Sequence, residues 1–203
     1  PEDVLANAFN VPLKRKDLLC LVGLEWLNDE VLNFYFNLIM QRELALREEA
    51  RADHHRVLIH NTFFYAKLME HNKYNYGNVR RWTRKGLKTD IFKLRVLLIP
   101  IHEGIHWTCA CAFMQEKRIC FYDSMGRHGR DHLKYIRQYI EDEYNNKKEG
   151  TLDASDWELL SNWQPKNKPI PQQRNGSDCG VFMSQFIRCL AFGKSFDSQK
   201  INQ

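Results

Sequence analysis

The clearest helical pattern lies near the N-terminal end of the sequence. Between Val31 and Arg47 the apolar residues recur at intervals of three and four, the period of an amphipathic helix. Asn28 or Asp29, directly before this run, is a suitable N-cap residue. Three further helices are predicted, over Thr62–Glu70, Asp131–Tyr144 and Cys179–Leu190.

Strand patterns fill the middle of the chain. Residues Leu94–Ile101 form a nearly continuous apolar run with the length of a buried strand. Two more strands, His106–Phe113 and Arg118–Met125, are joined by the polar turn Gln115–Lys117 and predict a hairpin. Helices interleaved with strands in this order indicate an α+β fold. Shorter strands are predicted over Val57–Ile59 and Trp157–Leu160.

The composition narrows the class of protein. A chain of 203 residues with 43% hydrophobic residues can build one ordinary domain, so disorder is not expected. The net charge of +5 is too weak to indicate nucleic-acid binding and suits an acidic protein partner. There is no signal peptide and no apolar run of about 18 residues, which predicts a soluble intracellular protein. The six cysteines are too sparse for a disulfide scaffold and indicate reduced thiols.

Cys179 stands where a reactive thiol would be expected. A polar loop containing Gly176 and Asp178 leads into Cys179 at the first turn of a predicted apolar helix. The helix dipole and the free N–H groups at such a position favour a thiolate, and they also suit an oxyanion. A lone cysteine at a helix start is more often a packing residue, so the assignment depends on its neighbours.

His106 and Asp123 are candidates for these neighbours. His106 begins one strand of the predicted hairpin and Asp123 lies near the end of the other, so the two should lie within a few residues of each other. A carboxylate on one imidazole nitrogen leaves the other free to accept a thiol proton. Taken singly, each has a structural explanation, as a strand-end histidine and a turn or cap aspartate. The order of these residues along the chain does not decide between the catalytic and the structural explanation, because catalytic triads occur in several orders.

Four ordered motifs resemble those of the sentrin/SUMO-specific protease family. They are Trp26-Leu27-Asn28-Asp29-Glu30, Pro100-Ile101-His102-Glu103-Gly104-Ile105-His106-Trp107, Tyr122-Asp123-Ser124-Met125-Gly126 and Pro171-Gln172-Gln173-Arg174-Asn175-Gly176-Ser177-Asp178-Cys179-Gly180. The resemblance covers about residues 10–200. It implies a papain-like cysteine protease fold, with a central mixed or antiparallel sheet flanked by helices and the order His, Asp, Cys. It also implies His106 as base, Asp123 as orienting carboxylate, Cys179 as nucleophile, and the Gln173 side chain as an oxyanion donor.

The resemblance implies a set of substrate contacts as well. Trp26 and Trp107 would roof a tunnel so narrow that it admits only the Gly-Gly tail of a modifier, because a slot between two flat rings excludes any Cβ. The alternative is that both tryptophans are core residues. Basic residues around Trp82 are equally compatible with a solvated face. The segments that face the modifier in similar proteins contain Asp29, Phe64, Arg81, Trp82 and His102.

The cysteines near His106 raise the question of a metal site. His102, His106, Cys109 and Cys111 are closely spaced, and Cys120 lies on the next predicted strand. Zinc ligands usually sit on tight knuckles. Here Cys109 and Cys111 share one face of a strand, and His106 has the opposite parity. Buried strand thiols are the better interpretation, and no metal or small-molecule cofactor is expected.

The resemblance predicts a hydrolase, a thiol endopeptidase and isopeptidase that cuts after the Gly-Gly of a SUMO-like modifier. It would mature the modifier precursor and remove the modifier from target lysines (desumoylation). The alternatives are a protease for another ubiquitin-like modifier and a catalytically silent module that binds one; four intact catalytic positions favour an enzyme.

The expected partners are the modifier and its conjugates, with no nucleic acid and no membrane, for a monomer in the nucleus or at the nuclear envelope. Residues 1–203 are expected to form one protease domain with two lobes, taken from a longer chain. An N-terminal regulatory region and the further helix that family members usually carry after the segment matching Ser195–Gln203 would then be missing.

Overall fold

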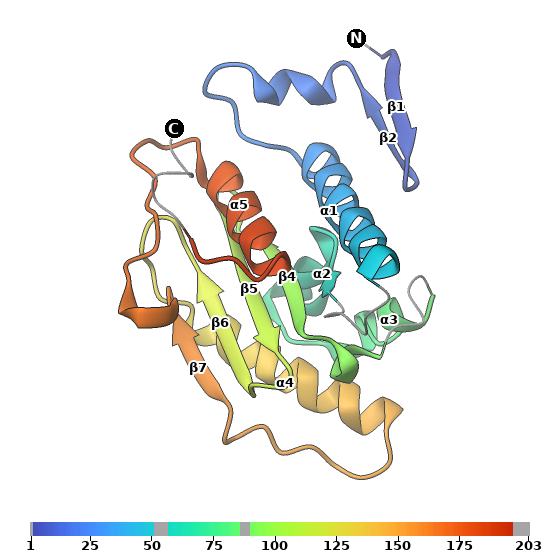
Figure 1. Ribbon diagram of the computed structural model, residues 1–203, viewed down its shortest axis with the longest axis vertical. Helices are drawn as coiled ribbons and strands as arrows, with labels where there is room; N and C mark the ends of the chain where they lie inside the picture. The colour runs from blue at the N-terminus through green and yellow to red at the C-terminus, as the bar shows by residue number, and fades with distance from the viewer. Residues whose placement is uncertain (1, 51–56, 86–89, 197–203) are drawn as a thin grey trace.

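A five-stranded mixed sheet forms the centre of the molecule (Figure 1). The computed structural model describes residues 2–50, 57–85 and 90–196. In spatial order the strands are β3 (Val57–Ile59), β4 (Val96–His102), β5 (Trp107–Phe113), β6 (Arg118–Tyr122) and β7 (Glu158–Ser161). The three central strands are antiparallel, and the two outer strands run parallel to their neighbours. The predicted mixed sheet is therefore confirmed.

Helices cover both faces of this sheet (Figure 1). One face carries α1 (Asp29–Ala50) and α5 (Cys179–Ala191). The other carries α2 (Phe63–Leu68) and α4 (Arg130–Lys147), with the short α3 (Trp82–Lys85) beside them. The described ranges also contain 3-10 turns at Asp17–Leu21, Glu70–Asn72, Tyr76–Asn78, Ile91–Lys93 and Pro165–Asn167. No helix of the described ranges is long and apolar enough to cross a membrane.

The alternation of side chains along each strand produces two separate cores. In β4, Val96 and Leu98 pack toward α5, whereas Leu97 and Ile99 pack toward α4. All four are fully buried. The apolar run in the sequence is nearly continuous because helices cover both faces of this strand.

The predicted helices form, with small changes at their ends. The Oδ1 of Asn28 accepts the backbone N–H of Val31 at 3.0 Å, so Asn28 is the N-cap of α1. The helix predicted over Thr62–Glu70 is shorter than expected, because Met69 leaves the helical conformation.

The strand predicted over Arg118–Met125 is also shorter and ends at Tyr122. After it the chain turns at once, since the N–H of Gly126 donates to the carbonyl of Asp123 at 2.9 Å. The other strand of the predicted hairpin, β5, begins at Trp107 rather than at His106. His106 and Asp123 therefore both lie just outside the sheet.

The short helix α3 was not predicted, and neither was an N-terminal hairpin of β1 (Val4–Ala8) and β2 (Val11–Lys14). Its two-residue turn uses Phe9 and Asn10 at φ of 59° and 58°, without the glycine that usually marks such a turn. The hairpin lies beside α1, away from the sheet (Figure 1). The division into two lobes stays a prediction. Residues 197–203, beyond which the resemblance places a further helix, lie outside the described residues.

Candidate active site

His106 and Asp123 meet at one end of the central hairpin. The antiparallel pairing of β5 with β6 places Cys109 opposite Tyr122, which brings the residues that flank the two strand ends side by side. The Nε2 of His106 lies 2.8 Å from the Oδ1 of Asp123. The carboxylate is 0% exposed, so this bond is shielded from water.

Cys179 begins α5 and is only 2% exposed. Its sulfur is hydrogen-bonded to His106 and accepts the backbone N–H groups of Trp107 and Gly180. Because Asp123 occupies Nε2 of His106, Nδ1 is the ring nitrogen left for the sulfur. The structure thus brings together all three residues predicted to form a triad, in an arrangement suited to an activated thiol.

The surroundings of this pair stabilise its charged form. Burial alone raises the pKa of the Cys179 thiol, but the hydrogen bonds from His106, Trp107 and Gly180 outweigh it, and the net pKa is lowered. The hydrogen bond to Asp123, followed by that to Cys179, raises the pKa of His106 to about 9 despite burial. Both shifts favour the ion pair of Cys179 thiolate and His106 imidazolium.

We expect iodoacetamide near pH 6 to alkylate Cys179 well before any other thiol, because only a thiolate reacts quickly. Cys20 and Cys189 are partly exposed and serve as the internal comparison, whereas the remaining thiols are fully buried: Cys109, Cys111 and Cys120. Peptide mapping by mass spectrometry at several pH values measures the labelling of each. Faster labelling of Cys20 or Cys189 would contradict an activated Cys179.

Gln173 is held on the loop that precedes α5. Its Oε1 accepts the hydroxyl of Ser124 at 2.5 Å, and its Nε2 donates to the carbonyl of Asn175 at 2.7 Å. The backbone N–H of Gln173 donates to the carbonyl of Ser124 at 3.0 Å, which ties the loop to the residue after Asp123. An amide has two N–H bonds, so one remains for an oxyanion. The role of Gln173 as oxyanion donor stays a prediction.

The segment before α1 lies directly against the start of α5. The indole N–H of Trp107 donates to the carbonyl of Leu27 at 3.0 Å. A Cβ added to Gly180 would lie 3.0 Å from the Cβ of Leu27 and 3.3 Å from the Cδ1 of Trp107, so only glycine fits between them without a shift. This packing brings Leu27, the neighbour of Trp26, against the turn that contains Cys179.

The two predicted tunnel residues differ in exposure. Trp26 is 49% exposed, so the alternative that it is a core residue is wrong. Trp107 is buried in the core, with its ring stacked under that of the exposed His102 at 4.1 Å between centroids. The tunnel itself stays a prediction.

One predicted substrate contact requires correction. Phe64 is 0% exposed, stacked on His60 at 3.7 Å and packed edge-on against Tyr139, so it has no surface for a substrate. Its neighbour Phe63 is the aromatic residue that α2 presents to solvent, at 50% exposure.

The other predicted contacts are spread over two regions. Arg81 is exposed and the half-buried Trp82 follows it; together with Arg80 they line a shallow depression on the α3 side of the molecule. Asp29 is the half-buried first residue of α1. The structure does not bring these residues into contact with His106 or Cys179, so their roles stay predictions.

The strand cysteines are core residues, as predicted. Cys109, Cys111 and Cys120 are fully buried beneath α5. Burial raises the pKa of the Cys109 thiol, which makes it a poor nucleophile. Among the side chains that the structure describes, no group of three or more His, Cys, Asp or Glu residues could hold a metal ion.

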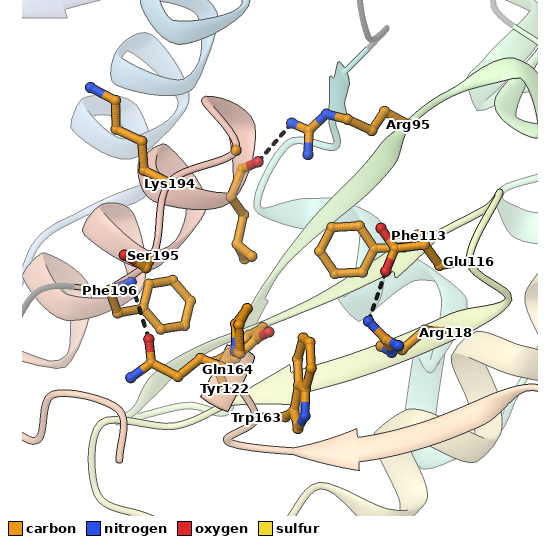
Figure 2. Close-up of a pocket in the computed structure, with 13 residues that line it drawn as sticks. Arg95, Phe113, Glu116, Arg118, Tyr122, Trp163, Gln164, Lys194, Ser195 and Phe196 are labelled. Atoms are coloured by element: carbon orange, nitrogen blue, oxygen red, sulfur yellow. Dashed lines mark hydrogen bonds and ion pairs between the residues drawn. The ribbon is translucent and has the colours of Figure 1, made fainter. Parts of the chain in front are cut away.

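A pocket of about 230 Å³ lies near the other end of α5 (Figure 2). None of the predicted site residues lines it. Its two arginines are already engaged: Arg95 donates to the carbonyls of Leu190 and Ala191, and Arg118 pairs with Glu116 and stacks on Trp163. The two arginines of this pocket are therefore already bound within the protein.

The sequence patterns did not identify two residues that hydrogen-bond to Asp123 on the side away from His106. Asn162, just after β7, accepts the N–H of Asp123 at 2.9 Å and donates to the carbonyl of Arg127 at 3.0 Å. Arg127 itself donates to Asp123 at 2.6 Å. Both lie outside the motifs that carry the resemblance.

Comparison with known proteins gives consistent results. The family model for the Ulp1 protease family, C-terminal catalytic domain, matches residues 25–203. The chain is 39% identical over 186 residues to a sentrin-specific protease of Caenorhabditis elegans, covering 92% of this chain and 24% of that protein. It therefore spans about a quarter of the length of that relative.

Two solved structures share the fold. The Ulp1-like SUMO protease catalytic domain of Chaetomium thermophilum superposes with a TM-score of 0.77 at 25% identity, covering 98% of this chain and 76% of that one. The yeast C-terminal Ulp1 protease domain, solved in complex with Smt3, the yeast ortholog of SUMO, gives a TM-score of 0.77 at 24% identity, covering 97% and 80%. The predicted α+β protease fold is thereby confirmed.

Proposed function

Because the chain belongs to the Ulp1 protease family, we propose that it is a cysteine protease that cuts after the Gly-Gly tail of a SUMO-like modifier. Cys179 is the nucleophile, His106 the general base and acid, and Asp123 the carboxylate that orients His106. The observation that carries this proposal is the chain of contacts from Asp123 through His106, at 2.8 Å, to the buried sulfur of Cys179.

The geometry supports a two-step acyl transfer. The Cys179 thiolate attacks the carbonyl carbon of the terminal glycine and forms a C–S bond, which places negative charge on the carbonyl oxygen. Gln173 and the N–H groups at the start of α5 are the proposed donors to this oxyanion. His106 gives its proton to the leaving nitrogen as the C–N bond breaks. Water, deprotonated by His106, then attacks the thioester carbonyl; the C–S bond breaks, the tail leaves as a carboxylic acid, and the Cys179 thiolate and His106 imidazolium are restored.

The choice of modifier rests on the relatives. The C. thermophilum relative is named a SUMO protease, and the yeast domain was solved with the yeast ortholog of SUMO. A peptide bond in a precursor and an isopeptide bond to a target lysine present the same acyl carbon, so one site can serve maturation and deconjugation. We further propose a nuclear location, which the resemblance to the family implies and which imaging of the tagged full-length protein would test.

Trapping with electrophiles tests the proposal. Ubiquitin-like proteins that carry a C-terminal electrophile are incubated with the wild-type protein and with Cys179→Ala, and covalent adducts are scored by gel shift. We expect adducts with SUMO-like proteins only, and none with Cys179→Ala. Adducts with a different modifier would reassign the substrate. Tight binding without an adduct in the wild type would identify a silent binding module.

Trp26 is the most direct test of the tunnel. We expect Trp26→Ala to lose about 10²-fold in activity on the native tail, since misplacement of the scissile bond by about 1 Å costs that much. It should also narrow the gap between substrates with Gly and with Ala at the penultimate position. Because Trp26 is 49% exposed, its melting temperature should stay close to that of the wild type.

The matched control is Val22→Ala, which truncates another exposed apolar residue of the same segment. For each variant, activity is measured on the substrates with Gly and with Ala at the penultimate position, and the melting temperature is measured by thermal unfolding. An unchanged Gly/Ala ratio in Trp26→Ala would show that the ring does not confine the tail.

A further inference from the structure

Arg127 occupies the oxygen of Asp123 that His106 does not use. The Oδ1 of Asp123 accepts from His106 at 2.8 Å and from the N–H of Met125 at 2.7 Å. Its Oδ2 accepts from the Nε of Arg127 at 2.6 Å. Asp123 is fully buried, and Arg127 is the charged partner of its Oδ2.

The backbone fixes Arg127 in this position. Gly126 turns the chain with a φ of +78°, and its N–H closes the turn onto the carbonyl of Asp123 at 2.9 Å. Asn162 holds both ends of the turn, because it accepts the N–H of Asp123 and donates to the carbonyl of Arg127. The Arg127 side chain therefore starts from a fixed point next to the carboxylate.

The outer end of Arg127 is held as well. Its Nη2 donates to Glu103 at 3.0 Å, and the other oxygen of Glu103 lies 3.1 Å from the Nε2 of His132. The backbone N–H of Glu103 donates to the carbonyl of His106 at 2.9 Å. The contacts thus form a closed ring that runs from His106 through Asp123, Arg127 and Glu103 back to His106.

We propose that Arg127, braced by Glu103, is a positioning residue that holds Asp123 in place as an ionised carboxylate against His106. This inference rests on the proposed roles of His106, Asp123 and Cys179. An arginine suits the task because it stays charged at any working pH and presents several donors in a rigid fork. One side chain therefore reaches Asp123 and Glu103 together.

The charge of Arg127 gives the role a measurable signature. The groups that face His106 are Asp123 and Cys179, which raise its pKa, and Arg127, which lowers it. Cys109 faces Asp123 from β5. Loss of the Arg127 charge should therefore raise the pKa of His106 further and move the alkaline limb of the rate profile to higher pH.

The test compares Arg127→Gln and Arg127→Lys with the wild type, with Arg130→Gln as control for the loss of a nearby exposed arginine. We expect Arg127→Gln to lose about tenfold in kcat with little change in KM, less than the 10² that a full 1 Å misplacement costs. Its alkaline limb should shift upward. Arg127→Lys should recover part of the rate and of the shift, and Arg130→Gln should match the wild type.

A second variant tests the brace. Glu103→Gln should lower kcat, as Arg127→Gln does, but by less. Combined with Arg127→Gln, it should add little, because residues in one hydrogen-bonded network are not additive. Full additivity would overturn the bracing role of Glu103.

The outcomes separate this inference from the proposed function. The pH dependence of Cys179 alkylation is measured in every variant and needs no substrate. If the wild type cuts no modifier but this profile shifts in Arg127→Gln, the proposed function fails and the positioning role stands. If the pH dependence of Cys179 alkylation is the same in Arg127→Gln as in the wild type, the positioning role is overturned. A loss of kcat that is explained by a lower melting temperature also overturns it. A downward shift is the opposite of the expected result and also overturns the role as proposed.

Discussion

Asp123→Asn should lose turnover on the order of 10⁴, a scale taken from the corresponding change in the serine protease triad, and should keep the fold. The amide has one acceptor oxygen, whereas the carboxylate serves His106, Met125 and Arg127 through two oxygens. Arg127 can only donate, so it favours the amide oxygen on its own side and turns the amide N–H toward Nε2 of His106. Nε2 must then accept, and the proton moves to Nδ1, the nitrogen that has to receive the thiol proton.

The asparagine also removes the charge that sustains the ion pair. Asp123 is the main reason that the pKa of His106 is raised to about 9. Without it, imidazolium and thiolate both become less stable at neutral pH, so alkylation of Cys179 near pH 6 should slow as well. Stopped-flow turnover, thermal unfolding and alkylation measure the three effects. Asp156→Asn, at an exposed carboxylate, is the control. Turnover within tenfold of the wild type would contradict the role of Asp123.

Gln173→Ala should lose turnover by about 10² to 10³, the cost of one oxyanion donor in a closed site. Binding of the modifier should hardly change, because the donor acts mainly in the transition state. Gln172→Ala is the matched control, since it removes the same side chain from the adjacent, exposed position. Steady-state kinetics measure the turnover, and a binding assay in the Cys179→Ala background measures the affinity for the modifier.

The contacts of Gln173 require one more measurement. Its side chain bonds to Ser124 and Asn175, so the truncation also loosens the loop that leads to Cys179. Alkylation by iodoacetamide separates the two effects, because that displacement develops no oxyanion. Slow turnover with normal alkylation identifies a lost oxyanion donor. If alkylation slows in parallel with turnover, Gln173 instead shapes the loop.

The candidate site could be predicted only in part from local pattern. His106 and Asp123 flank a hairpin with a short polar turn, so their proximity follows from strand pairing at a separation of 17 residues. The approach of Cys179 depends on how α5 crosses the sheet, a contact between distant segments that no local period encodes. It came from the resemblance alone.

The errors have similar causes. Phe63 and Phe64 are adjacent aromatic residues on a short helix, and their composition does not say which faces inward. Phe64 is the one that faces inward because His60 and Tyr139, which lie outside α2, pack against its ring. Arg127 was missed because a tight turn, rather than a helix or strand, brings it back to Asp123.

The near-complete burial of the Cys179 sulfur, at 2% exposure, has a consequence for inhibitor design. Next to it, Gly180 packs against Leu27 and Trp107 so closely that a Cβ added to Gly180 would not fit without a shift. A covalent inhibitor should therefore be a slender, unbranched chain with its electrophile at the tip. Broad aromatic scaffolds that suit open thiol sites should be excluded by width before their chemistry matters. Selectivity over other cellular thiols would then come from the shape of the molecule, and a mild electrophile would be sufficient.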